Sequence, residues 1–246
     1  MFDGVVRDLT ADPVWPNLAN PSAWIISAPG LDLAQQLHAL RDRPERRESI
    51  PEAQRLALRA VWPRLAEPSS LAQIDACWLP CLPDGLLLEI EANEPNARPR
   101  SAYLLWRPGV LLWLDGTSAP LYQAGGWGWW ALQEARSVIA YFQCFCTHLA
   151  NDGVFLLVER ATDIPWLPEA TPEIQTAVAE RLRPLELVQQ ADGSFSATGT
   201  MLFTKALLEV ELRLVGFQVE IPNDTLLLED LPVHRVVFRD GWRVIE

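Results

Sequence analysis

The segment from Trp127 to Glu159 constrains the fold most, because it joins a wide apolar helix face to an apolar strand. Between Trp129 and Leu149, apolar side chains recur at steps of three and four residues, which is the spacing of one helix face. Residues 151–153 tolerate the left-handed conformation that ends a helix. The unbroken apolar run at 154–158 is typical of a strand that is covered on both sides. We therefore expect a long buried helix followed directly by a core strand.

The first 70 residues predict a helical pair behind an extended lead-in. Prolines are frequent in residues 1–30, so this part is expected to be extended with one short strand around Ile25. Leucines at helical spacing predict a helix over 31–40. A second helix is expected from Pro51 to about residue 63, with Ser49 as a cap. After Pro68 the pattern changes from helical to extended.

The middle of the chain predicts strands at 86–91, 102–106 and 110–114. Pro108 followed by Gly109 is typical of a turn and indicates that the last two strands form a hairpin.

Two domains are one possible organisation, with an N-terminal region at 1–70 and an α+β core at 71–246. One continuous domain is the alternative.

The last third of the chain predicts a helix and then an antiparallel sheet. A hydroxyl cap at Thr171, followed by a proline and an acidic residue, predicts a helix to about Arg183. Strict alternation of apolar and charged residues over 208–214 indicates a strand with one solvated face. We expect a meander of five or six strands with turns at 222–224 and 240–241. The fold class is therefore α+β, with an N-terminal helical pair, a central β-hairpin and long buried helix, and a C-terminal antiparallel sheet.

Composition and charge narrow the classes of partner. The net charge of −12 argues against nucleic acid or an anionic membrane surface, since both require a positive field. No apolar run approaches the roughly 20 residues that span a bilayer. Four cysteines are too few for a disulfide scaffold, and the N-terminus has no apolar signal segment, so we expect a cytoplasmic protein.

Cysteine and histidine residues form the one constellation that suggests chemistry. Zinc takes four thiolate or imidazole ligands, and a zinc site is one hypothesis for a set of four side chains. A thiol nucleophile is the other hypothesis, but the cysteines near a helix C-terminus lie where the dipole disfavours a thiolate. We expect inert packed thiols, no metal and no cofactor. The residues of the alternative site are Cys77, Cys81, Cys144 and His148.

Tryptophan and arginine residues suggest binding surfaces. Large aromatic side chains concentrate binding energy at protein interfaces, although most tryptophans lie in cores. The arginines of the N-terminal helical pair form a basic region in an acidic protein, and both a solvated face and a docking surface are consistent with them. The candidate partner-binding residues are Trp127, Trp129, Trp130, Arg46, Arg47, Arg55 and Arg59.

Motifs of catalysis and of nucleotide binding are absent from the sequence. It contains neither Gly-x-Ser-x-Gly nor His-Glu-x-x-His, and the glycines at 125–128 lack the spacing of a dinucleotide-binding loop. We therefore expect a non-enzymatic protein that acts through protein–protein interaction. The alternative is an enzyme with a site built from dispersed residues around Cys144 and His148, with thiol- or zinc-dependent hydrolytic chemistry.

Overall fold

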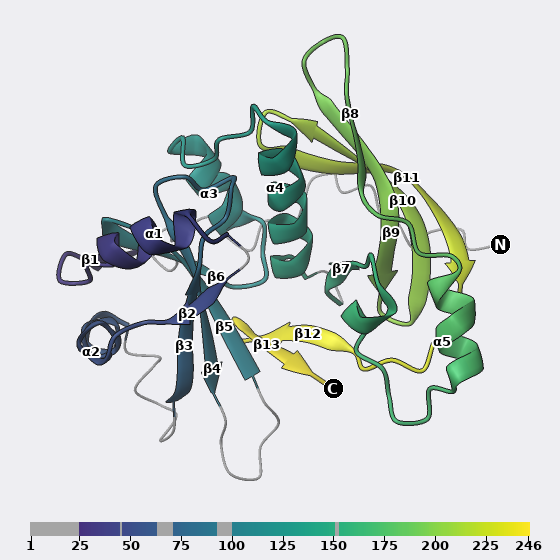
Figure 1. The fold of residues 1–246 in the computed structure, drawn as a ribbon, viewed down its shortest axis with the longest axis horizontal. Coiled ribbons are helices and arrows are strands. Elements are labelled where there is room, and N and C mark those ends of the chain that lie inside the picture. The colour runs from purple at the N-terminus through teal and green to yellow at the C-terminus, as the bar shows by residue number, and fades with distance from the viewer. Residues whose placement is uncertain (1–24, 45, 63–70, 93–99, 151–152) are drawn as a thin grey trace.

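The fold is a mixed α+β structure with two antiparallel sheets on either side of one helix (Figure 1). The computed structural model describes residues 25–44, 46–62, 71–92, 100–150 and 153–246. The proline-rich lead-in at 1–24 and the expected boundary at 68–70 lie outside the described residues. Within the described residues, no helix combines the length and the apolar character needed to cross a membrane.

Sheet A has the strand order β1-β6-β5-β4-β3-β2, and the hairpin of β12 and β13 joins it through β5. Apolar side chains alternate between its two faces, and both faces are buried at its centre. This explains why β5 and β6 read as unbroken apolar runs. The strands are β1 (Ile25–Ala28), β2 (Arg47–Ser49), β3 (Leu71–Cys77), β4 (Leu86–Ala92), β5 (Arg100–Arg107), β6 (Gly109–Leu114), β12 (Val236–Arg239) and β13 (Trp242–Ile245).

Sheet C has the order β11-β10-β9-β7, with β8 also paired to β9. In β10 the buried positions Val210, Leu212 and Leu214 alternate with exposed or partly exposed ones, which confirms the half-solvated strand. The strands are β7 (Phe155–Leu157), β8 (Glu186–Gln189), β9 (Phe195–Phe203), β10 (Ala206–Val215) and β11 (Gln218–Leu228).

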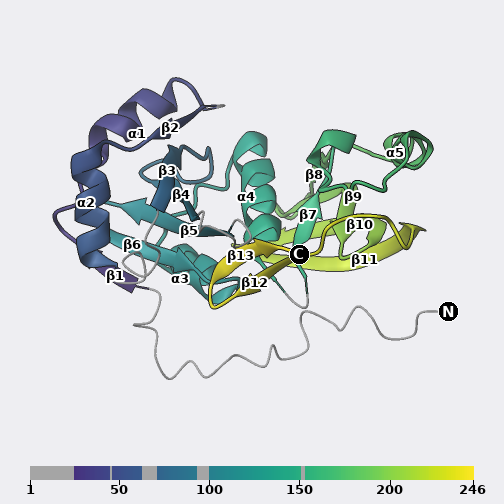
Figure 2. The ribbon, with the colours of Figure 1, turned by 90° about the horizontal axis from the view of Figure 1, so that it is seen from below.

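The helix α4 (Ala135–His148) lies between the two sheets, as Figures 1 and 2 show. Its buried side chains form one core with the inner faces of both sheets, including Tyr103 of β5 and Met201 of β9. Tyr141 adds a polar link, because its hydroxyl donates to the carbonyl oxygen of Phe217 at 2.6 Å. The expectation of a central helix buried along much of its girth is therefore confirmed.

Two smaller cores lie outside this central one. The helices α1 (Ala34–Arg41) and α2 (Glu52–Val61) cover the outer face of sheet A through Leu40 and Leu58 (Figure 2). A short 3-10 helix (Ala161–Asp163) and α5 (Pro172–Ala179) belong to a cluster on sheet C. The side chain of Thr171 caps α5 as expected.

The expected start of the central helix was wrong. A separate helix, α3 (Ala119–Gly126), comes first, and Gly128 has a φ of +69°, a conformation that lets the chain turn back. The two indoles that follow then pack onto α3: the ring nitrogen of Trp130 donates to the carbonyl oxygen of Leu121 at 2.9 Å. The central helix therefore begins at Ala135 and not near Trp129, and α3 precedes it.

The expected C-terminal meander was only partly correct. β11 runs through Pro222 without a turn, because β11 is an edge strand and a missing N–H is tolerated there. The last hairpin, β12 and β13, leaves sheet C and pairs with β5 of sheet A. Its turn at Asp240 and Gly241 is where we expected it.

The N-terminal helical pair shares a sheet with the rest of the chain. β1 pairs with β6 and β2 pairs with β3, so strands from both expected regions belong to sheet A. Ser49 lies in β2 and donates to Asp75 at 2.7 Å, so it does not cap α2. The predicted hairpin of β5 and β6 is confirmed.

Candidate functional site

Cys144 and His148, the candidate catalytic pair, are both buried in the core at the C-terminal end of α4. They lie one helical turn apart, and the exposed fraction of His148 is 3%. The Nδ1 atom of His148 is 2.7 Å from the carbonyl oxygen of Cys144 and 3.7 Å from its sulfur. Since a carbonyl oxygen only accepts, the neutral imidazole carries its hydrogen on Nδ1. Nε2 is therefore an acceptor.

The electrostatics of this pair oppose thiol catalysis. Burial raises the pKa of the Cys144 thiol well above its ordinary value. Burial also lowers the pKa of His148 from 6.5 to about 4, and the nearby charges of Arg243 and Arg47 lower it further. A nucleophilic pair requires a thiolate and an imidazolium. This buried environment disfavours the charged form of both side chains. At neutral pH the pair is a thiol and a neutral imidazole.

The thiols of the other cysteines also have raised pKa values. All four are free thiols, and burial raises the pKa of Cys77 to about 11 and that of Cys146 to about 12. Among the described residues, no three His, Cys, Asp or Glu side chains are grouped so as to hold a metal ion. The zinc alternative at Cys77, Cys81, Cys144 and His148 therefore gains no support from the geometry.

A chain of polar contacts crosses the inner face of sheet A beside His148. Arg47 of β2 forms an ion pair with Glu89 of β4. The hydroxyl of Tyr103 on β5 donates to the other oxygen of Glu89 at 2.9 Å. Arg243 of β13 then donates from Nη1 to the Tyr103 hydroxyl at 3.0 Å. Four strands therefore contribute one residue each to a continuous network.

Strand register explains why these residues meet. Glu89 and Tyr103 are directly opposite each other in the pairing of β4 with β5, so their side chains point to the same face. β6 pairs with β5 only from Tyr103 onward, which leaves the first residues of β5 open on that side. β13 pairs there, with Arg243 opposite Ser101. The hairpin therefore brings a cation next to the phenol.

Two polar atoms of this cluster have no hydrogen-bond partner. Both Nε of Arg243 and Nε2 of His148 are buried without one. The His148 ring packs edge-on against Tyr103, with 4.4 Å between the ring centroids. Burial raises the pKa of Tyr103, while Arg243 lowers it, so the hydroxyl keeps its proton at neutral pH. The cluster therefore contains one donor, Nε of Arg243, and one acceptor, Nε2 of His148, that lack a hydrogen-bond partner, and both lie next to the neutral side chain of Tyr103.

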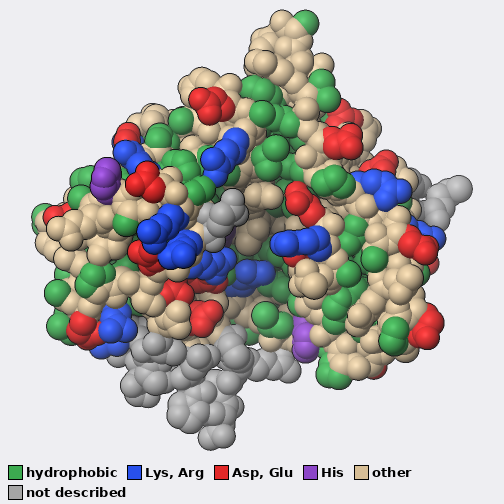
Figure 3. Space-filling model, in the orientation of Figure 1, with side chains coloured by type: hydrophobic (Ala, Val, Ile, Leu, Met, Phe, Trp, Pro, Cys, Tyr) green, Lys and Arg blue, Asp and Glu red, His purple; other side chains and the backbone are tan. Residues whose placement is uncertain are grey.

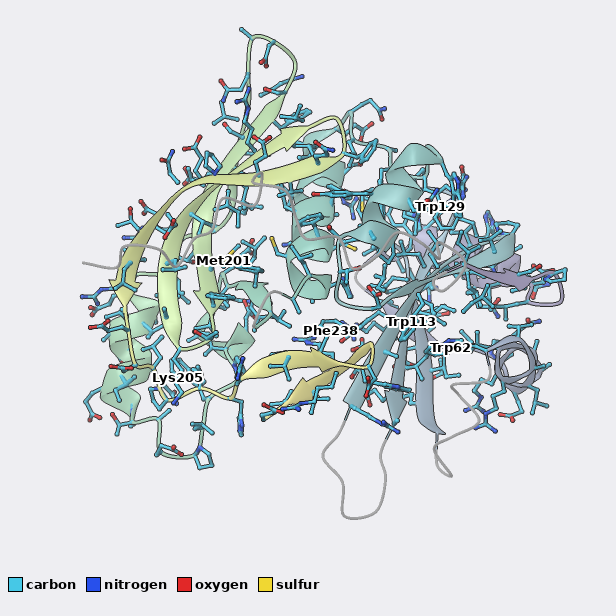
Figure 4. All side chains as sticks on the ribbon, turned by 180° about the vertical axis from the view of Figure 1, so that it is seen from behind. Trp62, Trp113, Trp129, Met201, Lys205 and Phe238 are labelled. Carbon is cyan, nitrogen blue, oxygen red and sulfur yellow. The ribbon has the colours of Figure 1, made fainter. Side chains whose placement is uncertain are left out.

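The face of the molecule drawn in Figure 3 is hollowed in its middle. Figure 3 shows a hollow in the middle of one face, between the sheet A side and the sheet C side, with Lys and Arg side chains gathered beside it. A further open hollow of about 350 Å³ lies between the Asp115–Thr117 loop and β12. It includes Phe238, the residue opposite Arg243 in the hairpin. Figure 4 places Phe238 on this hairpin between the two sheets.

Most of the expected aromatic patch is in the core. The exposed fractions of Trp129 and Trp130 are 7% and 8%, and both side chains belong to the central core. Trp127 is 39% exposed and is the one member of the three that reaches the surface. The physical reason is the turn after α3, which folds two of the indoles inward. These two side chains cannot be surface anchors in this conformation.

The expected basic region is split between two faces of sheet A. Arg55 forms an ion pair with Glu52 within α2, on the outer side. Arg46 and Arg59 are exposed. Arg47 alone of the four takes part in the inner polar network, and its side chain remains 63% exposed. Of these four arginines, Arg47 is therefore the one candidate that belongs to the polar network.

Sequence reasoning missed Tyr103 and Arg243 as site residues. Each lies in an apolar stretch of a strand, and a polar atom in such a stretch is a signal that a buried polar partner is required. The identity of that partner follows from strand pairing between residues 140 positions apart, which local periodicity does not contain.

The buried imidazole makes stability depend on pH. The unfolded chain binds a proton at His148 near pH 6.5, whereas the folded protein binds it only near pH 4. Its contribution to stability is therefore complete above pH 6.5 and is lost as the pH falls toward 4, by about 1.4 kcal/mol per pH unit. Urea unfolding across this window should show a shallower pH dependence in His148→Gln than in the wild type. Equal slopes would contradict the assignment of a neutral buried imidazole.

Comparison with known proteins finds no protein-family model that matches the chain, no similar curated protein and no similar solved structure. Any function must therefore be inferred from the residues of this chain.

Proposed function

We propose that the protein is a non-enzymatic binding protein that holds a partner protein at the hollow between its two sheets. The proposal depends on one contrast. The groups suited to chemistry, Cys144 and His148, are sealed and uncharged, while cationic groups lie beside an open surface. Binding needs accessible groups, whereas thiol catalysis needs an accessible thiolate.

The charge distribution supports a partner with an acidic contact region. The chain carries a net charge of −12, so its overall field repels acidic proteins. Arg47 is accessible, and its own carboxylate partner, Glu89, also accepts a hydrogen bond from Tyr103. A local positive region of this kind favours one orientation of an acidic partner and mainly raises the rate of association.

We place this binding function in the cytoplasm. The four cysteines are free thiols, and such thiols persist in a reducing compartment. An enzyme with thiol- or zinc-dependent chemistry is the alternative function. The raised pKa values of the thiols argue against thiol-dependent catalysis.

The test is an affinity capture from the native host lysate with matched arginine variants. Arg47→Gln removes the exposed charge of the polar network on sheet A but keeps a donor for Glu89, whereas Arg59→Gln removes an exposed charge on α2. We expect the wild type and Arg59→Gln to retain the same stoichiometric partner. Arg47→Gln should lower its affinity by about 3- to 10-fold, which corresponds to about 1 kcal/mol.

The same eluate also tests the alternatives. Unfolding curves of each variant check that the fold is intact. A wild-type protein that captures nothing, or a partner that both variants retain equally, would contradict a binding site at the hollow. Zinc at about one ion per chain in the eluate would favour the metal-dependent alternative.

A further inference from the structure

We infer that residues 15–21 of the chain dock in the hollow between the Asp115–Thr117 loop and β12, hereafter the loop–hairpin hollow. These residues belong to the segment ahead of β1, outside the described residues. The inference goes beyond the proposed function and does not depend on it, because the loop–hairpin hollow is separate from the hollow between the sheets. Three observations carry it: the strand order around β1, the lining of the hollow, and a three-residue apolar period in the segment.

The strand order directs the segment toward the hollow. β1 pairs with β6 from Ile25 opposite Leu112, but β6 continues to Leu114. β4 pairs along one edge of β5, so β6 and β13 follow each other along its other edge. β12 therefore lies in the next row, in line with β1. The residues just before Ile25 thus point to the end of β12 at Arg239.

The hollow extends along β12 from this point. Arg239, Val237 and Arg235 are alternate residues, so they share one face of the strand, and all three line the hollow together with Phe238. Val237 and Phe238 are partly exposed, while both arginines are exposed. From Arg239 to Arg235 an extended strand covers about 13 Å. The hollow, with a volume of about 350 Å³, therefore has an apolar floor with an arginine at each end.

The segment has an apolar residue at every third position. Trp15, Leu18 and Pro21 are three residues apart, with Asn17 and Asn20 between them. The polyproline II conformation, which the prolines of this segment favour, has three residues per turn. It places the three apolar side chains on one edge and the two asparagines on another. At about 3.1 Å per residue, the six steps from Pro21 to Trp15 cover about 19 Å, enough to follow the hollow.

The two patterns fit each other. β12 occupies the row that β1 would extend into, so the segment has to leave the sheet, and a proline without an N–H suits that point. With Pro21 beside Arg239, the segment runs along β12 toward Arg235. Leu18 then packs on the apolar floor of the hollow. The indole of Trp15 stacks with the guanidinium of Arg235.

Covalent attachment favours this segment over a separate peptide. Only residues 22–24 lie between Pro21 and the first residue of β1. A tether this short gives the segment an effective concentration in the millimolar range at the hollow. A contact of weak intrinsic affinity is therefore formed for most of the time within one chain.

Paramagnetic broadening in the full chain tests the contact. A nitroxide is attached through Asn17→Cys, on the asparagine edge of the segment, and amide signals are recorded in ¹⁵N-labelled protein. Every sample carries Cys77→Ser, because Cys77 is partly exposed whereas the other three cysteines are buried. Unfolding curves check that each variant is folded. We expect the label to remove the amide signals of Thr117 and Phe238.

Two substitutions with matched controls separate docking from the closeness that the tether imposes. Leu18→Asp disturbs the apolar edge of the segment, whereas Asn20→Asp puts the same charge on its polar edge. Val237→Lys disturbs the floor of the hollow, whereas Val215→Lys changes an exposed valine on the outer face of sheet C. We expect Leu18→Asp and Val237→Lys to restore the lost signals, and both controls to leave them broadened.

The remaining outcomes overturn the inference. Equal broadening in all variants would mean that the tether alone holds the label near the hollow. An absence of broadening would remove the contact altogether. A further sample mixes ¹⁵N-labelled protein without nitroxide and unlabelled protein with it. Broadening in this mixture would assign the hollow to the segment of a second copy.

Discussion

Phe142→Ala should lower the free energy of unfolding by about 3–5 kcal/mol. Phe142 is fully buried on α4, where it belongs to the core that the two sheets share. Truncation removes its transfer free energy and leaves a cavity that rigid strands on both sides cannot close. Chemical denaturation, followed by fluorescence of the tryptophans, measures the change.

Gln143→Ala is the matched control for this substitution. Gln143 is the next residue on α4 and its side chain is exposed, so we expect a change within about 0.5 kcal/mol. A loss below about 1 kcal/mol for Phe142→Ala would mean that α4 does not form the shared core.

Gly241→Ala should cost about 2–5 kcal/mol of stability. The glycine forms the turn between β12 and β13 with a φ of +75°, and a Cβ atom there would overlap Cζ2 of Trp113. Trp113 cannot move easily, because it packs against Trp62 in the outer core (Figure 4). The positive φ contributes about 1–2 kcal/mol and the steric overlap about 1–3 kcal/mol.

Gly193→Ala separates these two contributions. Gly193 has a similar φ of +84°, but nothing lies within 4 Å of an added Cβ atom. We expect this variant to lose only the backbone contribution, as measured by the same denaturation experiment. Equal losses for the two glycines would contradict the close packing of the last hairpin on Trp113.

Local patterns predicted the elements whose structure depends on their own residues. Proline and glycine at 108–109 indicated the hairpin of β5 and β6, and the hydroxyl of Thr171 indicated the start of α5. Alternation in β10 indicated which of its side chains are buried. These signals lie within a few residues of one another, so a single sequence contains them.

The candidate site could not be predicted in the same way. Arg243 and Tyr103 are separated by 140 residues, and they meet because β6 leaves part of β5 unpaired for β13. The burial of Trp129 and Trp130 likewise follows from a turn after α3 that helical periodicity conceals. Both cases depend on which elements pack together, and apolar spacing alone does not encode that choice.

Hydrogen exchange of the captured complex, compared with the free protein, tests the central claim most directly. We predict slower exchange of backbone amides in β2, at the start of β5 and in β13, the strands that carry Arg47, Tyr103 and Arg243. The outer face of sheet C, including the β8–β9 turn, should exchange at the same rate in both states. Protection confined to sheet C, or no difference between the two states, would contradict a partner-binding site at the hollow between the sheets.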